Sequence, residues 1–267
     1  MTESALARFG TEYAAHRAAE GRGYAAEDLF SLPWLKRGPL ARQWSVRARS
    51  FEAFVRHVLR PLSRSVGGPL LVLDLGAGNG WLSYRVALEG HLATALDIRN
   101  DTVDGLGAAE PFAQCIPHRI ERLAASFDDI PRASASMDLA VFNASLHYST
   151  DLGRTLTEAA RVVRPGGRLV ILDSPFYRRE QDGSAMVAQK RAEAPQRFGD
   201  RAGALLALPF AEFLTRERLE AASAGARLIW RRGRVLYPLW YELRPAVAAL
   251  RGARPPSRFD LWTAVRP

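Results

Sequence analysis

Three glycines in five positions follow an acidic residue in the stretch LVLDLGAGNGWLS, which begins at Leu71. Gly76, Gly78 and Gly80 would let the backbone turn sharply and approach a ligand closely, because glycine has no Cβ atom. Nearby backbone amides could then bind a phosphate or a carboxylate. The chemistry that this stretch could do is therefore the binding of a nucleotide or a related cofactor.

Two phosphate-binding motifs fit this spacing poorly. A P-loop needs a lysine and then a serine or threonine after its last glycine, whereas Gly80 is followed by Trp81 and Leu82. A dinucleotide loop has the spacing G-x-G-x-x-G, and its third glycine lets the helix pack closely. Counted from Gly76, the third position holds Trp81. The P-loop is excluded and the dinucleotide loop is disfavoured, which leaves a nucleoside cofactor without phosphates.

A second acidic residue occurs at the separation that a bound ribose requires. Asp97 ends the apolar run LATALD, seventeen residues after Gly80, and a carboxylate there can accept hydrogen bonds from ribose hydroxyls. Taken singly, Asp74 could be a capping residue and Asp97 an exposed acid at a strand end. The presence of both acids at this separation favours cofactor binding.

Four segments in this order resemble the class I S-adenosylmethionine-dependent methyltransferases. LDLGAGNGWLS resembles the glycine motif of that family, LATALDI its ribose-binding strand, SMDLAVFN its fourth strand, and RVVRPGGRLVILDS its fifth strand with the preceding helix and turn. The resemblance covers about residues 70–175 and implies S-adenosylmethionine as the cofactor. The residues that it assigns to the cofactor are Asp74, Gly76, Ala77, Gly78, Asp97, Ile98, Phe127, Asp128 and Asn143.

The same resemblance implies where each part of the cofactor would bind. Gly76 and Gly78 would lie against its amino-acid part, which Asp74 would contact through water. Asp97 would hold the ribose. Ser126 stands where the family usually has an acid in the adenine loop. The residues expected at the adenine are Ile98, Ser126 and Phe127, with Asp128 adjacent.

His147 is the candidate catalytic residue. It follows the fourth predicted strand in FNASLHYS, and ligands of parallel sheets bind beyond the carboxyl ends of the strands. An imidazole with an ordinary pKa could remove a proton from a hydroxyl or phenol, or it could line the pocket without exchanging a proton. Asn143 is expected to face the methyl region or to satisfy backbone groups. The other histidines have no metal-ligand spacing, so no metal is expected.

The elements that must position these residues alternate between strand and helix. Such alternation predicts parallel strands joined by right-handed crossovers. We therefore expect a doubly wound, Rossmann-like α/β sheet, mostly parallel with an antiparallel last strand. The predicted strands are 70–75, 92–98, 137–143, 168–174, 226–232 and 259–267, and the helices between them include 80–90, 151–163 and 215–225.

The chain is predicted to divide into an N-terminal helical cap or lid at residues 1–66 and a methyltransferase domain at 67–267. QWSVRARSFEAFVRHVL has its apolar residues near one helical face, and Pro61 with VGGP is expected to end this helix. Residues 175–210 interrupt the alternation. They are predicted to be mostly irregular, with a helix around AMVAQKRAEA, and to form a lid over the substrate.

Composition and charge limit the partners and the cellular location that can be expected. The net charge is +9, but the only lysines are Lys36 and Lys190, and the arginines are scattered. Nucleic acid is therefore a possible but not favoured partner. The single cysteine, Cys115, excludes an internal disulfide. The sequence lacks a signal-peptide pattern and an apolar run long enough to span a membrane. A cytoplasmic protein without a membrane partner is expected.

The function that these features favour is methyl transfer from S-adenosylmethionine to a small-molecule acceptor, preferably at oxygen, by in-line displacement. Two alternatives stay open. One is a tRNA or rRNA methyltransferase whose scattered arginines contact phosphates. The other is a non-catalytic protein that binds the cofactor and serves as an interaction module. The sequence indicates no oligomeric state.

Overall fold

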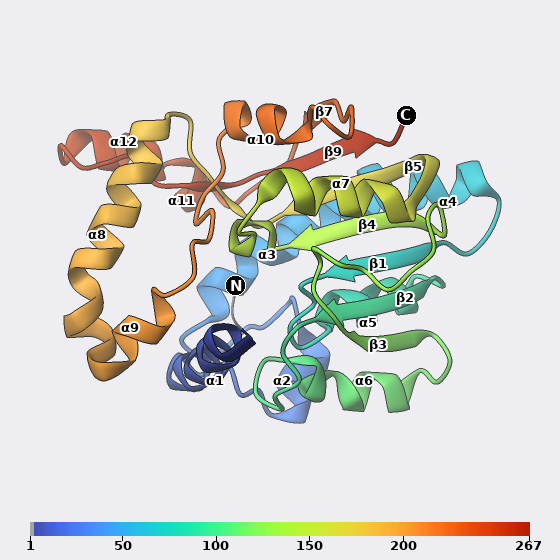
Figure 1. The fold of residues 1–267 in the computed structure, drawn as a ribbon, viewed down its shortest axis with the longest axis horizontal. Helices are drawn as coiled ribbons and strands as arrows, with labels where there is room; N and C mark the ends of the chain where they lie inside the picture. The colour runs from blue at the N-terminus through green and yellow to red at the C-terminus, as the bar shows by residue number, and fades with distance from the viewer. Residues whose placement is uncertain (1–2) are drawn as a thin grey trace.

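The computed structural model describes residues 3–267, which form a seven-stranded sheet with helices on both faces (Figure 1). In spatial order the strands are β3 (Ile120–Ala124), β2 (Leu92–Asp97), β1 (Leu71–Leu75), β4 (Met137–Asn143), β5 (Val163–Leu172), β9 (Leu261–Val265) and β7 (Trp230–Gly233). The first five are mutually parallel, and β9 pairs antiparallel with both β5 and β7. The predicted doubly wound sheet with an antiparallel last strand is confirmed.

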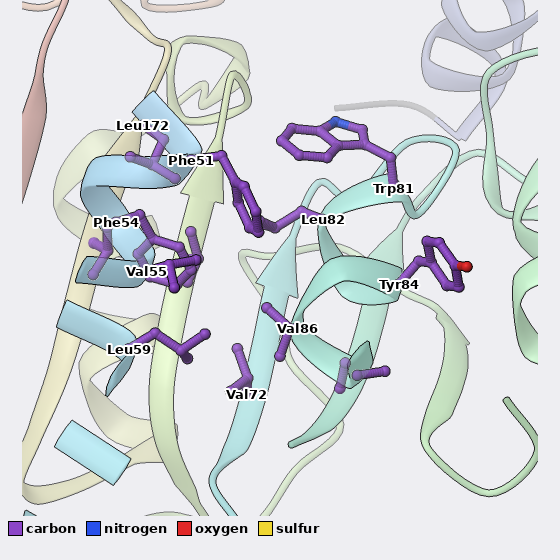
Figure 2. Packing of buried hydrophobic residues seen from close by; sticks show 14 of the residues in the cluster. Phe51, Phe54, Val55, Leu59, Val72, Trp81, Leu82, Tyr84, Val86 and Leu172 are labelled. Carbon is purple, nitrogen blue, oxygen red and sulfur yellow. The ribbon is translucent and has the colours of Figure 1, made fainter. Parts of the chain in front are cut away.

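Two apolar cores lie on opposite faces of the sheet. One core joins the sheet to α2 (Ala26–Ser31), α3 (Ala41–Phe54), η1 (Val55–Leu59), α4 (Arg60–Val66), α5 (Trp81–Leu88) and α6 (Glu110–Cys115). The other joins it to α7 (Leu152–Val162) and α10 (Arg216–Ser223). Residues from α2 to α4 thus share a core with the strands. Figure 2 shows Phe51 near Trp81, and their rings meet edge to face with centroids 5.7 Å apart.

The remaining elements lie at the carboxyl ends of the strands or connect the last strands. In Figure 1 the arrowheads of β1, β2 and β4 point toward the side on which three helices gather. These helices are α1 (Glu3–Ala19), α8 (Glu180–Phe198) and α9 (Ala202–Leu205). The other elements are η2 (Leu106–Ala109), η3 (Leu146–Tyr148), η4 (Gly199–Arg201), α11 (Leu239–Glu242), α12 (Arg244–Leu250), and the paired strands β6 (Pro175–Phe176) and β8 (Arg258–Phe259).

Of the two features predicted to end the helix that begins at Ala41, VGGP does so and Pro61 does not. The chain stays helical from α3 through η1 and α4 and ends at Val66, where Gly67 has a left-handed backbone with φ of 79°. A proline inside an α-helix removes one hydrogen bond and clashes with the carbonyl four residues earlier. The turn before Pro61, η1, is a π-helix, and this wider turn is a way to accommodate the proline.

Three further segments differ from the sequence-based expectation. RPGG does not form a simple turn, because it lies within β5 where the pairing register shifts between Met137 and Leu139. Strand β3 had no counterpart among the predicted strands, since only Ile120 is buried in it. Residues 175–210 are mostly helical, because α8 runs for 19 residues. In residues 3–267 there is no helix with the length and apolar content needed to span a membrane.

Helix α8 packs against the body of the protein through a glycine. A Cβ atom added at Gly183 would lie 2.1 Å from the Phe213 ring, whereas one at Gly203 in α9 would meet nothing within 4 Å. We expect Gly183→Ala to lower the free energy of unfolding by about 1–3 kcal/mol, the usual cost of overpacking. Gly203→Ala is the control and should be neutral or stabilising by about 0.5–1 kcal/mol. Urea unfolding of both variants measures this, and equal midpoints would contradict the close packing.

Candidate active site

One cavity of about 380 Å³ lies at the carboxyl ends of the parallel strands. Its walls include the loops that follow β1, β2, β4 and β5, together with side chains from α1 and α3. Folds with a doubly wound sheet bind their ligands at the loops that follow the strands. Because these loops come from different strands, the cavity brings together residues that are far apart in the sequence.

The glycine loop after β1 forms one wall of this cavity. Gly76, Gly78 and Gly80 have φ values of 74°, 54° and 74°. A Cβ atom at Gly76 would lie 2.5 Å from the Cβ of Ser145. The backbone amides of Gly76 and Ala77 donate to the carbonyl of Leu96 at 2.8 and 2.9 Å. These contacts fix the loop against β2, and glycine is the residue that tolerates this backbone.

Asp97 lies at the end of β2 and faces the same cavity. One carboxylate oxygen accepts the backbone N–H of Gly78 at 2.8 Å, and the other accepts that of Arg99 at 2.9 Å. Burial raises the pKa of Asp97, while Arg99 opposes the shift. A carboxylate can accept about four hydrogen bonds, so Asp97 keeps capacity for a ligand. Ile98 beside it is 43% exposed and also lines the cavity.

Asp74 occupies a different position from the other predicted cofactor residues. It is 1% exposed and accepts the Ser83 hydroxyl at 2.9 Å. Its second oxygen, Oδ1, hydrogen-bonds to no residue in the described part of the chain. Burial raises the pKa of Asp74 to about 7. Among the described residues, Asp74 is not one that lines the cavity, so it lies behind the glycine loop rather than in the wall.

The loop after β3 brings Ser126, Phe127 and Asp128 to the cavity. The Ser126 hydroxyl accepts the backbone N–H of Asp128 at 3.1 Å, which shapes the turn. The carboxylate of Asp128 accepts the Thr155 hydroxyl from α7. Phe127 packs edge to face on Phe142 of β4, with centroids 6.0 Å apart. Ser126, Phe127 and Asp128 therefore lie together in the cavity lining.

Asn143 and His147 line the cavity beyond the end of β4. The Oδ1 of Asn143 and the Nδ1 of His147 are buried, and neither hydrogen-bonds to any described residue. Burial lowers the pKa of His147 to about 3, and the positive charges of Lys190, Arg47 and Arg17 act in the same direction. The imidazole is therefore neutral near pH 7, with one ring nitrogen directed to no protein partner among residues 3–267.

Two charged residues of the cavity had no role in the sequence-based prediction. Arg47 comes from α3, and Asp173 follows β5 directly. Asp173 is 2% exposed, and burial raises its pKa to about 6 although Arg47 opposes the shift. The strand-end rule that selected Asp97 also applies to Asp173 in VILDS. Arg47 had no such signal, because it is one of many arginines in its helix.

A family model described as a methyltransferase domain matches residues 73–171. The malonyl-[acyl-carrier protein] O-methyltransferase of Erwinia pyrifoliae is 34% identical over 104 residues, which are 39% of this chain and 37% of that protein. The chain thus matches well under half the length of this curated relative. Residues 73–171, which the family model matches, contain the glycine loop, Asp97 and Asn143.

Two solved structures share the fold over most of the chain. The 1,6-didemethyltoxoflavin-N1-methyltransferase of Burkholderia thailandensis, with bound 1,6-didemethyltoxoflavin and S-adenosylhomocysteine, has a TM-score of 0.55 at 19% identity and covers 98% of this chain and 88% of that one. The geranyl diphosphate C-methyltransferase of Streptomyces coelicolor A3(2), in complex with Mg²⁺, geranyl diphosphate and S-adenosylhomocysteine, has a TM-score of 0.59 at 16% identity, covering 95% and 98%. The central segment of the chain thus matches a methyltransferase domain family, and the fold over most of the chain is the one found in these two methyltransferases.

Proposed function

We propose that the protein transfers a methyl group from S-adenosylmethionine to a small organic acceptor, with oxygen as the favoured nucleophile. The observation that carries this proposal is that one cavity is lined both by the glycine loop with Asp97 and by Asn143 with His147. When bound, the cofactor supplies an electrophilic methyl carbon. The protein then contributes mainly positioning and the exclusion of water.

We assign the cofactor to the residues that the sequence analysis selected. The glycine backbone at Gly76, Ala77 and Gly78 fits the amino-acid part of the cofactor, because a Cβ atom at Gly76 would close the loop against Ser145. The remaining lone pairs of Asp97 fit the ribose hydroxyls. The buried, unshared Oδ1 of Asp74 fits a contact through water. The residues assigned to the adenine are Ile98, Phe127 and Asp128, and Asn143 is assigned to the methyl region.

The helices at the strand ends are proposed to act as a lid over the acceptor. Phe9 of α1 packs with Leu205 and Leu208 of the segment after α8. The hydroxyl groups of Tyr13 and Tyr148 lie 2.7 Å apart, which joins α1 to the loop after β4. These contacts would keep water away from a transferring methyl group. They support assigning residues 175–210, together with α1, to acceptor binding.

The cavity favours a small acceptor over a nucleic acid. An RNA strand is held by arginines that are free to contact phosphates. Here Arg17 pairs with Asp104 at 2.7 Å and Arg99 pairs with Asp101 at 3.0 Å. The three similar proteins are named for O-, N- and C-methylation, so the choice of oxygen rests on this cavity. A hydroxyl is a hydrogen-bond donor, and the Oδ1 of Asn143 and the Nδ1 of His147 in this cavity are acceptors without a described partner.

The experiment for this proposal is labelling with S-adenosylmethionine that carries ¹⁴C in its methyl group. The purified protein is incubated with the small-molecule fraction of a cell extract and, separately, with total RNA. The expected result is a labelled small molecule whose label is in an O-methyl group. Label at a defined nucleotide of RNA would make the acceptor class wrong. If S-adenosylhomocysteine binds but nothing is labelled, the protein is a cofactor-binding module instead of an enzyme.

His147 is proposed to orient the acceptor rather than to remove its proton. With a pKa of about 3, the imidazole is a weak base near neutral pH. His147→Gln should therefore lower kcat by no more than about tenfold, the equivalent of one lost hydrogen bond. The affinity for S-adenosylhomocysteine should stay the same. A loss of about 10²–10⁴, the range for a general base, with a shifted pH profile would assign the proton transfer to His147.

A further inference from the structure

Two opposite charges that do not pair with each other line the cavity. Arg47 projects from α3 and Asp173 lies beyond β5, and both line the cavity. The Nε of Arg47 and both carboxylate oxygens of Asp173 are buried and make no hydrogen bond of normal geometry to residues 7–267, although the Ser50 hydroxyl acts on Asp173 to lower its pKa. No ion pair within 4.0 Å joins the two side chains, although each alters the pKa of the other. Two buried, opposite and unpaired charges are costly unless a ligand satisfies them.

The position of Asp173 places it beside the methyl region. Leu172 is paired with Asn143 across β5 and β4, and the Leu172 carbonyl accepts the backbone N–H of Ala144 at 2.8 Å. Asp173 has a φ of 52° and Ala144 a φ of 56°. Left-handed backbone at residues other than glycine is uncommon and concentrates at functional sites. The two strand ends therefore hold Asp173 next to Asn143 at some cost in backbone energy.

The surroundings of the pair favour a flat, neutral ligand. The guanidinium of Arg47 lies 5.0 Å from the centre of the Trp44 ring, and Trp44 itself lines the cavity. The titratable groups that act on Asp173 are Arg47 from α3, and Tyr237 and Tyr241 from the segment before β8. The opposite charges of Arg47 and Asp173 offset each other. An anion would be repelled by Asp173, and a cation would be repelled by Arg47.

We propose that Arg47 and Asp173 bind the acceptor, and that this acceptor is a neutral organic molecule with an ionisable hydroxyl group next to a second oxygen atom. This inference rests on the proposed function. The guanidinium donates to the second oxygen, and the hydroxyl donates to the Asp173 carboxylate. During transfer the hydroxyl oxygen uses an electron pair to form the new O–C bond, the C–S bond breaks with its pair left on sulfur, and the hydroxyl proton moves to Asp173.

The protonation state of Asp173 agrees with this role. Burial raises its pKa to about 6, so the carboxylate is ionised at pH 7 and can still accept a proton. A pKa above the ordinary value means that the ionised form is present above about pH 6 and is lost as the pH falls through this value. The interaction with a hydroxyl donor should therefore weaken below about pH 6. Because His147 is proposed only to orient the acceptor, another residue must take the hydroxyl proton, and we assign this catalytic role to Asp173.

The test compares two ring compounds that differ only in the hydroxyl group. 3-Hydroxy-4-pyranone has a hydroxyl next to a carbonyl oxygen, and 4-pyranone lacks the hydroxyl. Each is titrated by calorimetry into the protein saturated with S-adenosylhomocysteine. We expect the hydroxyl compound to bind at least about tenfold more tightly at pH 7.5, the scale of a hydrogen bond to a charged group. This preference should decrease below about pH 6.

Asp173→Asn should abolish the preference for the hydroxyl compound. Arg47→Gln should weaken the binding of both compounds, because both have the oxygen atom to which the guanidinium donates. Neither variant should change the affinity for S-adenosylhomocysteine. Asparagine tolerates the left-handed backbone at position 173, so the fold should survive. The matched control is Asp138→Asn, which changes a buried carboxylate at the amino end of β4 that accepts the Leu71 N–H. The control should retain the preference.

The outcomes separate the two proposals. If the wild type does not bind S-adenosylhomocysteine, the proposed function fails, and this inference fails with it. If S-adenosylhomocysteine binds but the two pyranones bind equally, only the acceptor assignment fails. A preference that persists in Asp173→Asn, or that is lost equally in Asp138→Asn, also contradicts the role of Asp173. The proposal is supported if Asp173→Asn loses the preference, Arg47→Gln binds both pyranones more weakly, and Asp138→Asn retains the preference.

Discussion

Replacing Gly76 with alanine is expected to lower the affinity for S-adenosylhomocysteine by about 100-fold, or nearly 3 kcal/mol. The φ of 74° is unfavourable for alanine, and the added Cβ atom would lie 2.5 Å from the Cβ of Ser145. The loop must then move away from β2, which displaces the backbone that we assign to the amino-acid part of the cofactor. Calorimetric titration with S-adenosylhomocysteine measures the change.

Gly90→Ala is the control for the backbone cost alone. Gly90 has a φ of 94°, and a Cβ atom there would meet nothing within 4 Å. Both variants should lose stability from the left-handed backbone, by about 1–2 kcal/mol. Only the Gly76 variant should lose cofactor affinity. Unchanged affinity in a folded Gly76→Ala protein would mean that the glycine loop does not hold the cofactor.

Removal of the Asp97 carboxylate should weaken binding of S-adenosylhomocysteine by about 1–3 kcal/mol, or roughly 5- to 150-fold. In Asp97→Ala the ribose hydroxyls lose their acceptor, and the backbone amides of Gly78 and Arg99 lose theirs. The same titration of Asp138→Ala, which lacks a buried carboxylate outside the cavity, controls for general destabilisation. Equal affinity of the Asp97 variant and the wild type would remove Asp97 from the ribose site.

The sequence predicted the centre of the fold well because its strands are nearly continuous apolar runs. Strands β1, β2 and β4 are buried along most or all of their length, and such runs separated by helices leave few arrangements. Strand β3 lies at the edge of the sheet and buries only Ile120, so it has little pattern to detect. Helix α8 contains Gly183 and Pro195, which are typical of loops in a sequence.

The candidate site also contains residues that the sequence predicted and residues that it did not. Gly76 and Asp97 were predicted because their spacing along the chain reflects one local unit of strand, loop, helix and strand. Arg47 and Asp173 are 126 positions apart in the sequence. Both line the same cavity only because α3 packs on the sheet face near the end of β5. The pKa of His147 also depends on burial and on Lys190, Arg47 and Arg17. A local sequence pattern cannot predict such long-range effects.

Calorimetric titration of the wild-type protein with S-adenosylhomocysteine and, separately, with NAD tests directly whether the cavity binds S-adenosylmethionine or a dinucleotide. The cavity wall formed by the glycine loop, Asp97 and Phe127 predicts saturable binding of S-adenosylhomocysteine at one site per chain, with little or no binding of NAD, because Trp81 stands where a dinucleotide loop has its third glycine. Saturable binding of NAD without binding of S-adenosylhomocysteine would contradict the account.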